Sequence, residues 1–171
     1  MRAIKKIIII FIICMVPIIF VDLYPFPEPS QFVSNETFVK NSNPFFTYEV
    51  TKYPSKVEII TPQYEEGRLQ IGFVVDKWNL NFGIIPLGNN EKRHLTIVNS
   101  EKNKVRVNLK VYGDINPLIS FNENNFILSP NNSTYIDILL NTTEKTKPGN
   151  YTGEIDIIVK KSNLNFLNWM L

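Results

Sequence analysis

The chain has 171 residues and nearly balanced charge, with 18 basic and 16 acidic residues and a formal net charge of +2. Three of the basic residues and one acidic residue lie within residues 1–23, so residues 24–171 carry 15 of each and no net charge. Because a nucleic-acid-binding domain concentrates basic residues on one surface, this composition argues against nucleic-acid binding. The single cysteine, Cys14, lies near the N-terminus, which excludes disulfides from the rest of the chain.

The N-terminal segment begins with basic residues and continues as an apolar run. Three basic residues precede the run at residues 7–21, and Asp22 ends it. This order is typical of a membrane-targeting segment whose basic end stays in the cytoplasm. The residues that follow contain no A-x-A-like cleavage site. Residues 1–23 are therefore predicted to be an uncleaved anchor that contacts the membrane through residues 7–23 and places the remaining chain outside it. A cleaved signal peptide is the alternative.

Residues 24–67 differ in character from the rest of the chain. They contain six of the eleven prolines and many aromatic residues, with little periodicity. Proline-rich segments adopt extended polyproline-like backbone, so this region is predicted to be a stalk. Fully extended at ~3.1 Å per residue, residues 24–62 would span on the order of 100 Å. One strand is expected at residues 56–61, and part of the aromatic region is expected to pack on the domain that follows.

From residue 68 to residue 161 the pattern predicts β-strands. Residues 104–112 alternate between apolar and polar side chains, which is the period of a strand with one buried face. Shorter alternations occur at residues 69–75, 136–140 and 151–159, and turn-forming residues separate them. We expect an all-β domain, an antiparallel sandwich of about seven strands, with no helix beyond the anchor.

Residues 78–100, WNLNFGIIPLGNNEKRHLTIVNS, carry a more specific pattern. An apolar strand reaches a Phe-Gly pair, a Pro-x-Gly turn follows, and the next strand ends in asparagine. The residues of this pattern are Phe82, Gly83, Pro86, Gly88 and Asn99. It resembles the opening of immunoglobulin-like domains related to the major sperm protein and the ASPM–SPD-2–Hydin group. Residues 148–159 resemble the last hairpin of many prokaryotic extracellular domains of that superfamily. The resemblance implies a single immunoglobulin-like sandwich at residues 68–161, and such sandwiches serve many functions.

The pattern also predicts structural roles for three residues. Phe82 is expected in the core, and Gly83 is expected to allow an unusual backbone angle after it. Asn99 is expected to hydrogen-bond nearby backbone where its strand leaves the sheet. Trp78 is expected to serve the fold.

Several N-x-S/T sequences occur outside the predicted anchor. The candidate glycosylation sites are Asn35, Asn131, Asn132, Asn141 and Asn150. Such sites fit a surface location outside the cytoplasm. A chain rich in asparagine also produces them by chance, so both explanations stay open.

Residues that would support catalysis or metal binding are scarce. The only histidine, His94, is expected on an exposed strand face, and no nucleophile motif accompanies it. Asp114, Asn116, Asn122 and Glu123 match no spaced calcium loop. We therefore expect no catalytic residues, no metal and no cofactor, although a carboxylate pair of a hydrolase is a remote alternative.

The C-terminal residues 162–171 form an apolar tail that is far too short to cross a membrane. Phe166 and Trp169 are its candidate contacts with a protein partner or with the membrane interface, where tryptophan is favoured. Packing of the tail against the sandwich is the alternative.

These features together predict a non-enzymatic, single-pass protein of the cell membrane. Its domain is expected outside the cytoplasm, where it would make structural or adhesive contacts with a protein of the envelope. An accessory subunit or chaperone of a membrane or secretion complex is the alternative, with the apolar helix as the docking element.

Overall fold

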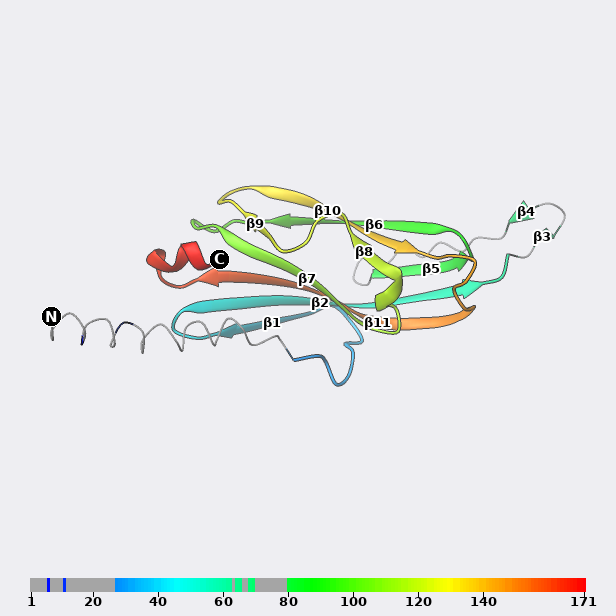
Figure 1. Cartoon of the computed structure of the whole chain (residues 1–171), viewed down its shortest axis with the longest axis horizontal. Coiled ribbons are helices and arrows are strands. Elements are labelled where there is room, and N and C mark those ends of the chain that lie inside the picture. Colours follow the sequence, from blue (N-terminus) through cyan, green and yellow to red (C-terminus); the bar gives the residue numbers. More distant parts are fainter. Residues whose placement is uncertain (1–5, 7–10, 12–26, 63, 66–67, 70–79) are drawn as a thin grey trace.

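The computed structural model of the protein describes residues 27–62, 64–65, 68–69 and 80–171, together with Lys6 and Phe11. Within these residues the chain is mostly β-structure in largely antiparallel sheets (Figure 1), which confirms the predicted all-β class. The predicted anchor, apart from Lys6 and Phe11, lies outside the described residues, as do Trp78 and residues 70–75 of the alternation expected at residues 69–75. Within the described part, no helix is both long and apolar enough to cross a membrane.

The described elements are strands of two main sheets, a small ribbon and two short 3₁₀ helices. They are, in chain order, β1 (Thr37–Ser42), β2 (Phe46–Ile60), β3 (Tyr64–Glu65), β4 (Arg68–Leu69), β5 (Leu80–Pro86), β6 (Asn90–Val98), β7 (Val105–Gly113), η1 (Asn116–Leu118), β8 (Ile119–Phe121), β9 (Phe126–Leu128), β10 (Ser133–Asn141), β11 (Gly149–Ser162) and η2 (Asn165–Met170). The count exceeds seven partly because β3, β4, β8 and β9 are too short to produce a periodic pattern in the sequence.

The larger sheet has six strands in the order β1-β2-β11-β7-β9, with β5 also paired to β2. Its long central strands, β2 and β11, pair antiparallel along their whole overlap. β5 runs parallel to the second half of β2. The smaller sheet has three antiparallel strands in the order β6-β10-β8. In Figure 1, β6 and β10 of the smaller sheet lie toward one side of the view, and β1, β2 and β11 of the larger sheet lie toward the other.

One apolar core lies between the six-stranded and the three-stranded sheet. The alternation predicted for residues 104–112 is confirmed, because Val105, Val107 and Leu109 are buried while the residues between them are only partly covered. The buried members of the core are Val57, Ile59, Leu80, Phe82, Ile85, Ile97, Val105, Val107, Leu109, Ile115, Leu118, Leu128, Ile136, Ile138, Leu140, Ile155 and Ile157. Burial of this set from both sheets is the main stabilising term of the domain.

The structure differs from the predicted stalk at residues 24–67, because β2 occupies much of that region and lies in the middle of the six-stranded sheet. The expected strand at residues 56–61 is the end of this longer strand. Pro54 sits between the stretch of β2 that pairs with β1, which ends at Lys52, and the stretch that pairs with β5, which begins at Ser55. A proline lacks a ladder donor, so this gap is where the strand accommodates it.

The structural roles predicted for the Phe-Gly pattern are confirmed. Phe82 is buried in the core, and Gly83 has a φ of 77° where the β2–β5 register shifts. The side-chain amide of Asn99 donates hydrogen bonds to the backbone carbonyls of Asn103, Leu128 and Ser129, at 3.0–3.1 Å. Its side-chain oxygen accepts one from the Glu101 N–H at 3.0 Å. Asn99 therefore ties the end of β6 to the loop before β7 and to the end of β9.

Candidate interaction surfaces

The five asparagines of the predicted glycosylation sites are all exposed. Asn35 precedes β1, Asn131 and Asn132 lie in the turn between β9 and β10, Asn141 ends β10, and Asn150 lies near the start of β11. The Asn141 side chain already donates a 3.0 Å hydrogen bond to Ser120 Oγ. Their exposure is compatible with modification, and glycosylation stays a prediction.

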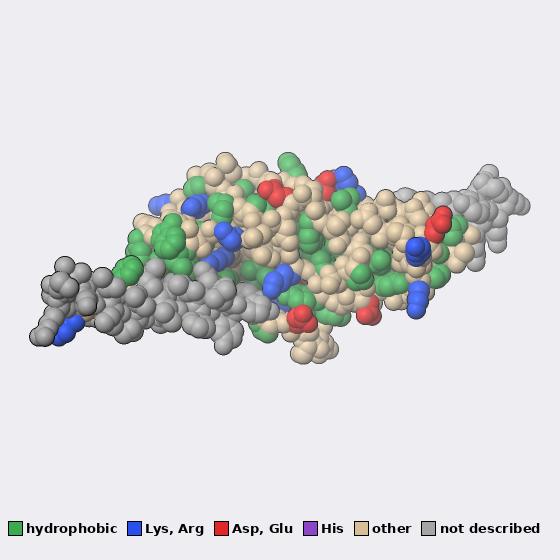
Figure 2. Space-filling model, viewed as in Figure 1, with side chains coloured by type: hydrophobic (Ala, Val, Ile, Leu, Met, Phe, Trp, Pro, Cys, Tyr) green, Lys and Arg blue, Asp and Glu red, His purple; other side chains and the backbone are tan. Residues whose placement is uncertain are grey.

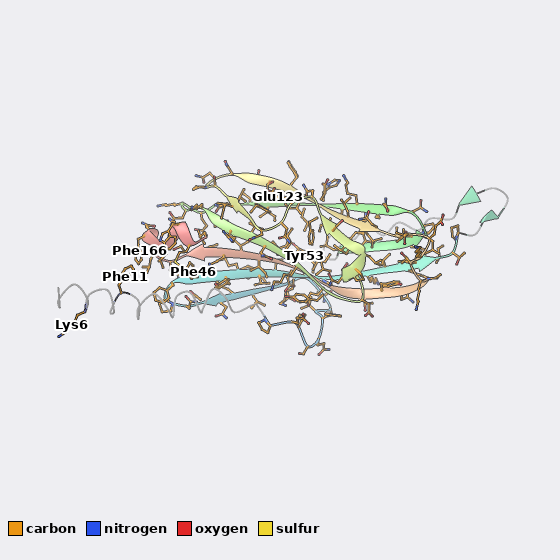
Figure 3. The ribbon with its side chains drawn as sticks, in the orientation of Figure 1. Lys6, Phe11, Phe46, Tyr53, Glu123 and Phe166 are labelled. Carbon is orange, nitrogen blue, oxygen red and sulfur yellow. The ribbon has the colours of Figure 1, made fainter. Side chains whose placement is uncertain are left out.

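The C-terminal tail is half buried and half exposed. Leu167 and Leu171 are 2% and 5% exposed and pack against the fully buried ring of Phe46, at the start of β2. Phe166 and Trp169 are 69% and 67% exposed. Figure 3 labels Phe166 and Phe46 toward the same end of the molecule. Leu167 and Leu171 therefore pack on the domain, whereas Phe166 and Trp169 stay available for contact with a partner or a membrane.

Polar contacts hold the tail to the hairpin between β1 and β2. Asn163 donates from its backbone N–H to the Phe45 carbonyl at 2.8 Å and from its side chain to the Asn43 carbonyl at 2.7 Å. Thr47 Oγ1 donates to Asn163 Oδ1 at 2.8 Å. The Lys160 ammonium group lies 4.0 Å from the centre of the Phe46 ring, a cation–π contact. The position of η2 is thus set by the start of β2 and the end of β11, which lie side by side at one end of the central strand pair.

The outer face of the three-stranded sheet, which faces away from the core, carries exposed apolar side chains. Tyr135 on β10 is 70% exposed and Val98 on β6 is 61% exposed. Thr96 pairs with Tyr135 across the two strands, and Val98 lies two residues further along the same face. Val98 is diagonal to Tyr135 across the two strands, a spacing that an aromatic side chain can bridge. They form a continuous patch of Thr96, Val98 and Tyr135, which we call the β10 patch.

His94, Asp137 and Lys92 adjoin the β10 patch on the same outer face. His94 Nδ1 lies 2.6 Å from Asp137 Oδ1, and Lys92 Nζ lies 2.9 Å from Asp137 Oδ2. The Lys92 and His94 hydrogen bonds hold the pKa of Asp137 below its usual value. The exposure predicted for His94 is confirmed, whereas its pairing with Asp137 was not predicted because the two lie 43 residues apart. Among the described residues, no serine, threonine or cysteine side chain is hydrogen-bonded to His94.

A buried ionic cluster lies on the outer face of the six-stranded sheet. Lys52 Nζ is 2.7 Å from Glu154 Oε1 and 3.3 Å from Asp156 Oδ2, and the Glu154 side chain is fully buried. Burial raises the pKa of Asp156 from 3.8 to about 6, and the neighbouring Glu154 carboxylate adds to this shift while Lys52 opposes it. Asp156 Oδ1 and Tyr112 Oη are buried without a hydrogen-bond partner in the described part of the chain. The sheet therefore holds two acids with one close cation.

Residues 27–36, which we call the strap, cover this cluster. The Val33 N–H donates a 2.9 Å hydrogen bond to Glu154 Oε2. The Phe32 ring approaches Gly113 so closely that a side-chain carbon at that position would lie 2.8 Å from it. Glu36 hydrogen-bonds Tyr53, and burial together with this contact raises the pKa of Tyr53 to about 12. The strap is thus part of the domain.

The structure assembles no metal site from the residues it describes, where no three histidine, cysteine or acidic side chains are grouped to hold an ion. The four residues considered for calcium lie apart along the chain, Asp114 and Asn116 around η1 and Asn122 and Glu123 between β8 and β9. Among the described residues, large apolar side chains are exposed in the β10 patch, in the aromatic pair of the tail and on the edge strand β1 at Phe38 and Val39. In comparisons with known proteins, no protein-family model, no curated protein and no solved structure matches this chain.

Proposed function

We propose that the chain is a non-enzymatic protein of the cell envelope, held in the membrane by residues 7–23. Outside the membrane it presents an immunoglobulin-like sandwich for structural or adhesive contact with another protein. The observation that carries this proposal is the β10 patch. It exposes a tyrosine and a valine at diagonal positions of two neighbouring strands, on a sheet face that the described residues leave open. Tyrosine is enriched in protein interfaces because its ring supplies apolar area and its hydroxyl a hydrogen bond.

The fold supports the immunoglobulin-like part of the proposal. Two sheets share one core, and their strands are mainly antiparallel. The Phe-Gly pattern that carries the family resemblance occupies β5, with Phe82 in the core. Kinship with the domains related to the major sperm protein remains a proposal.

Site-specific cross-linking in the native cell tests the proposed contact. A photoreactive phenylalanine analogue at position 135 is expected to capture one defined protein, and Val98→Arg is expected to abolish this product because it places a charge within the patch. The same analogue at position 38 is the control, because Phe38 is 60% exposed on β1, in the other sheet. The proposal would be contradicted if positions 135 and 38 gave the same amount of cross-linked product. It would also be contradicted if Val98→Arg left the product at position 135 unchanged.

The alternative is an accessory subunit of a membrane complex that docks through its apolar helix. One observation favours it, namely that the strap is fixed to the domain and so leaves few residues between the predicted anchor and the sheet. Exchanging residues 1–23 for an unrelated anchor distinguishes the two proposals. Loss of the cross-linked product after the exchange would favour the subunit, whereas its persistence would favour contact through the β10 patch.

A further inference from the structure

We propose that Phe166 and Trp169 rest in the interface of the same membrane that holds the anchor, so that the domain touches the lipid surface through its C-terminal tail. This inference rests on the proposed anchor and adds to it an orientation of the domain. The β10 patch would then face away from the membrane, toward partners.

The geometry of η2 places the two aromatic side chains together. Residues three apart superimpose along a 3₁₀ helix, so Phe166 and Trp169 share one side of it. Leu167 of η2 and Leu171, directly after it, are buried against Phe46 and hold the helix on the domain. Two large, exposed aromatic rings on a firmly held turn are unfavourable in water and are typical of residues at a membrane interface. The positions of Phe166 and Trp169 therefore suit burial of both rings in a membrane interface.

The strap and η2 lie on the same side of the six-stranded sheet. Residues of β2 with even numbers point to one face, and the even-numbered residues of β11 pair with them. Phe46, which holds η2, is on this face together with Glu154, which binds the strap. The three-stranded sheet covers the other face. The start of the domain and its aromatic tail thus point in the same general direction.

The short tether brings this face near the lipid. Only four residues, 23–26, separate Asp22, which ends the apolar run, from Pro27, where the strap begins, so the two are joined by five Cα–Cα steps. Fully extended, they reach about 17 Å. The strap-binding end of β11 at Gly153 lies nine residues from Ser162, a distance of about 30 Å along the strand. Because the domain is held this close to the bilayer, a tilt of the whole domain brings η2 into contact with the lipid without any change in the fold.

The charge around η2 also favours a lipid surface. Asn103 donates a hydrogen bond to Asn165 and so brings the loop containing Lys102 and Lys104 beside the tail. The only acid of that loop, Glu101, is paired with Lys161 at 2.8 Å. Figure 2 shows Lys and Arg side chains next to hydrophobic ones at this end of the molecule. Apolar rings flanked by basic side chains are the pattern of interfacial membrane contacts.

Depth-dependent fluorescence quenching tests this inference on the full-length protein. The chain has two tryptophans, so Trp78→Phe leaves Trp169 as the only one. The protein is reconstituted into vesicles of phosphatidylglycerol and phosphatidylcholine, the latter with or without brominated acyl chains. We expect the Trp169 emission to be blue-shifted and to lose intensity in the brominated vesicles, and aqueous iodide to quench it little. If Trp78→Phe does not fold, the difference between the unaltered protein and Trp169→Phe reports the same residue.

A matched control carries Trp78→Phe, Trp169→Phe and Tyr135→Trp, which moves the probe to the β10 patch. Its emission is expected to respond to iodide and not to brominated lipid. If the protein resists alkaline extraction from the vesicles but its Trp169 is quenched only by iodide, the tail contact is wrong and the anchor stands. Trp169 shielded from both quenchers would mean that protein covers it, which also overturns the lipid contact. If alkali releases the protein from the vesicles, the proposed anchor and this inference both fail.

Discussion

At the scale of single residues, Asp156 shows how burial and pairing compete. Lys52 lies closer to Glu154 than to Asp156. The charge of the buried Asp156 carboxylate is therefore only partly compensated by Lys52, and the Glu154 carboxylate lies nearby. One of its oxygens has no hydrogen-bond partner among the described residues. A carboxylate in such surroundings favours its protonated form, in agreement with its raised pKa.

The raised pKa predicts how stability depends on pH. Between 3.8 and about 6 the folded protein keeps a proton on Asp156 that the unfolded chain has released. The free energy of unfolding of the unaltered protein should therefore fall through this window as pH rises, relative to Asp156→Asn, which cannot titrate. The relative loss is on the order of 2–3 kcal/mol for a shift of about two units. Urea titrations of the unaltered protein and of Asp156→Asn at pH 4 and pH 7 measure this loss. If the difference in free energy of unfolding between the two proteins is the same at pH 4 and pH 7, this account is contradicted.

Phe82 gives a second prediction at this scale. Because the ring is only 1% exposed in the shared core, Phe82→Ala should lower the free energy of unfolding by roughly 3–5 kcal/mol. Phe38→Ala is the control, since Phe38 is largely exposed and its loss should cost less than about 0.5 kcal/mol. Equal losses from the two substitutions, measured by urea titration, would show that Phe82 does not hold the two sheets together.

The sequence predicted some of these residues and missed others for a physical reason. Phe82, Gly83 and Asn99 belong to a compact sequence pattern, which predicted their roles although Asn99 contacts Leu128 and Ser129 about 30 residues away. Glu154 and Asp156 stand at positions of an alternating strand that normally face solvent. The group that covers Glu154 is the N–H of Val33, which is 121 residues away, and no local pattern reports such a contact.

At the scale of elements, the strap belongs to the domain and bears on the proposed attachment to the membrane. It was predicted as part of an extended stalk, yet its backbone and side chains bind the six-stranded sheet through Glu154 and Gly113. If residues 7–23 are the anchor, as proposed, the reach of about 100 Å estimated for an extended stalk no longer applies.

Loosening the strap should free it without unfolding the sheets. Phe32→Ala removes the ring that lies against Gly113, so the Val33 amide should exchange with solvent faster. The melting temperature should change little, because Phe32 is itself 37% exposed. Hydrogen exchange followed by mass spectrometry of the full-length protein measures this. Unchanged exchange at residues 27–36, or the same increase in Phe38→Ala, would contradict the assigned role.

β2 could not be recognised from its sequence, because its two halves have different surroundings. In its second half Val57 and Ile59 enter the core, which is the part that the pattern predicted. In its first half Thr47, Glu49 and Thr51 occupy the corresponding positions, and Glu49 pairs with Lys40 and Lys161 instead of entering the core. The apolar alternation that marks a strand is therefore absent there, and Pro54 interrupts the pattern further.

At the scale of the whole molecule, the two outer faces differ. The six-stranded sheet carries the strap and holds the aromatic tail, while the three-stranded sheet carries the β10 patch. In the proposed arrangement the first face is turned to the membrane and the second to the surroundings. The proposed function depends on contact through these two faces.

The central claim is that an uncleaved anchor holds the domain at the membrane, and the intact mass of the native protein from the membrane fraction tests it most directly. We predict the mass of the complete chain, 19.8 kDa, with any glycan as an added increment. A mass lower by about the first 23 residues, the length of a removed targeting segment, would contradict the claim and indicate a released protein.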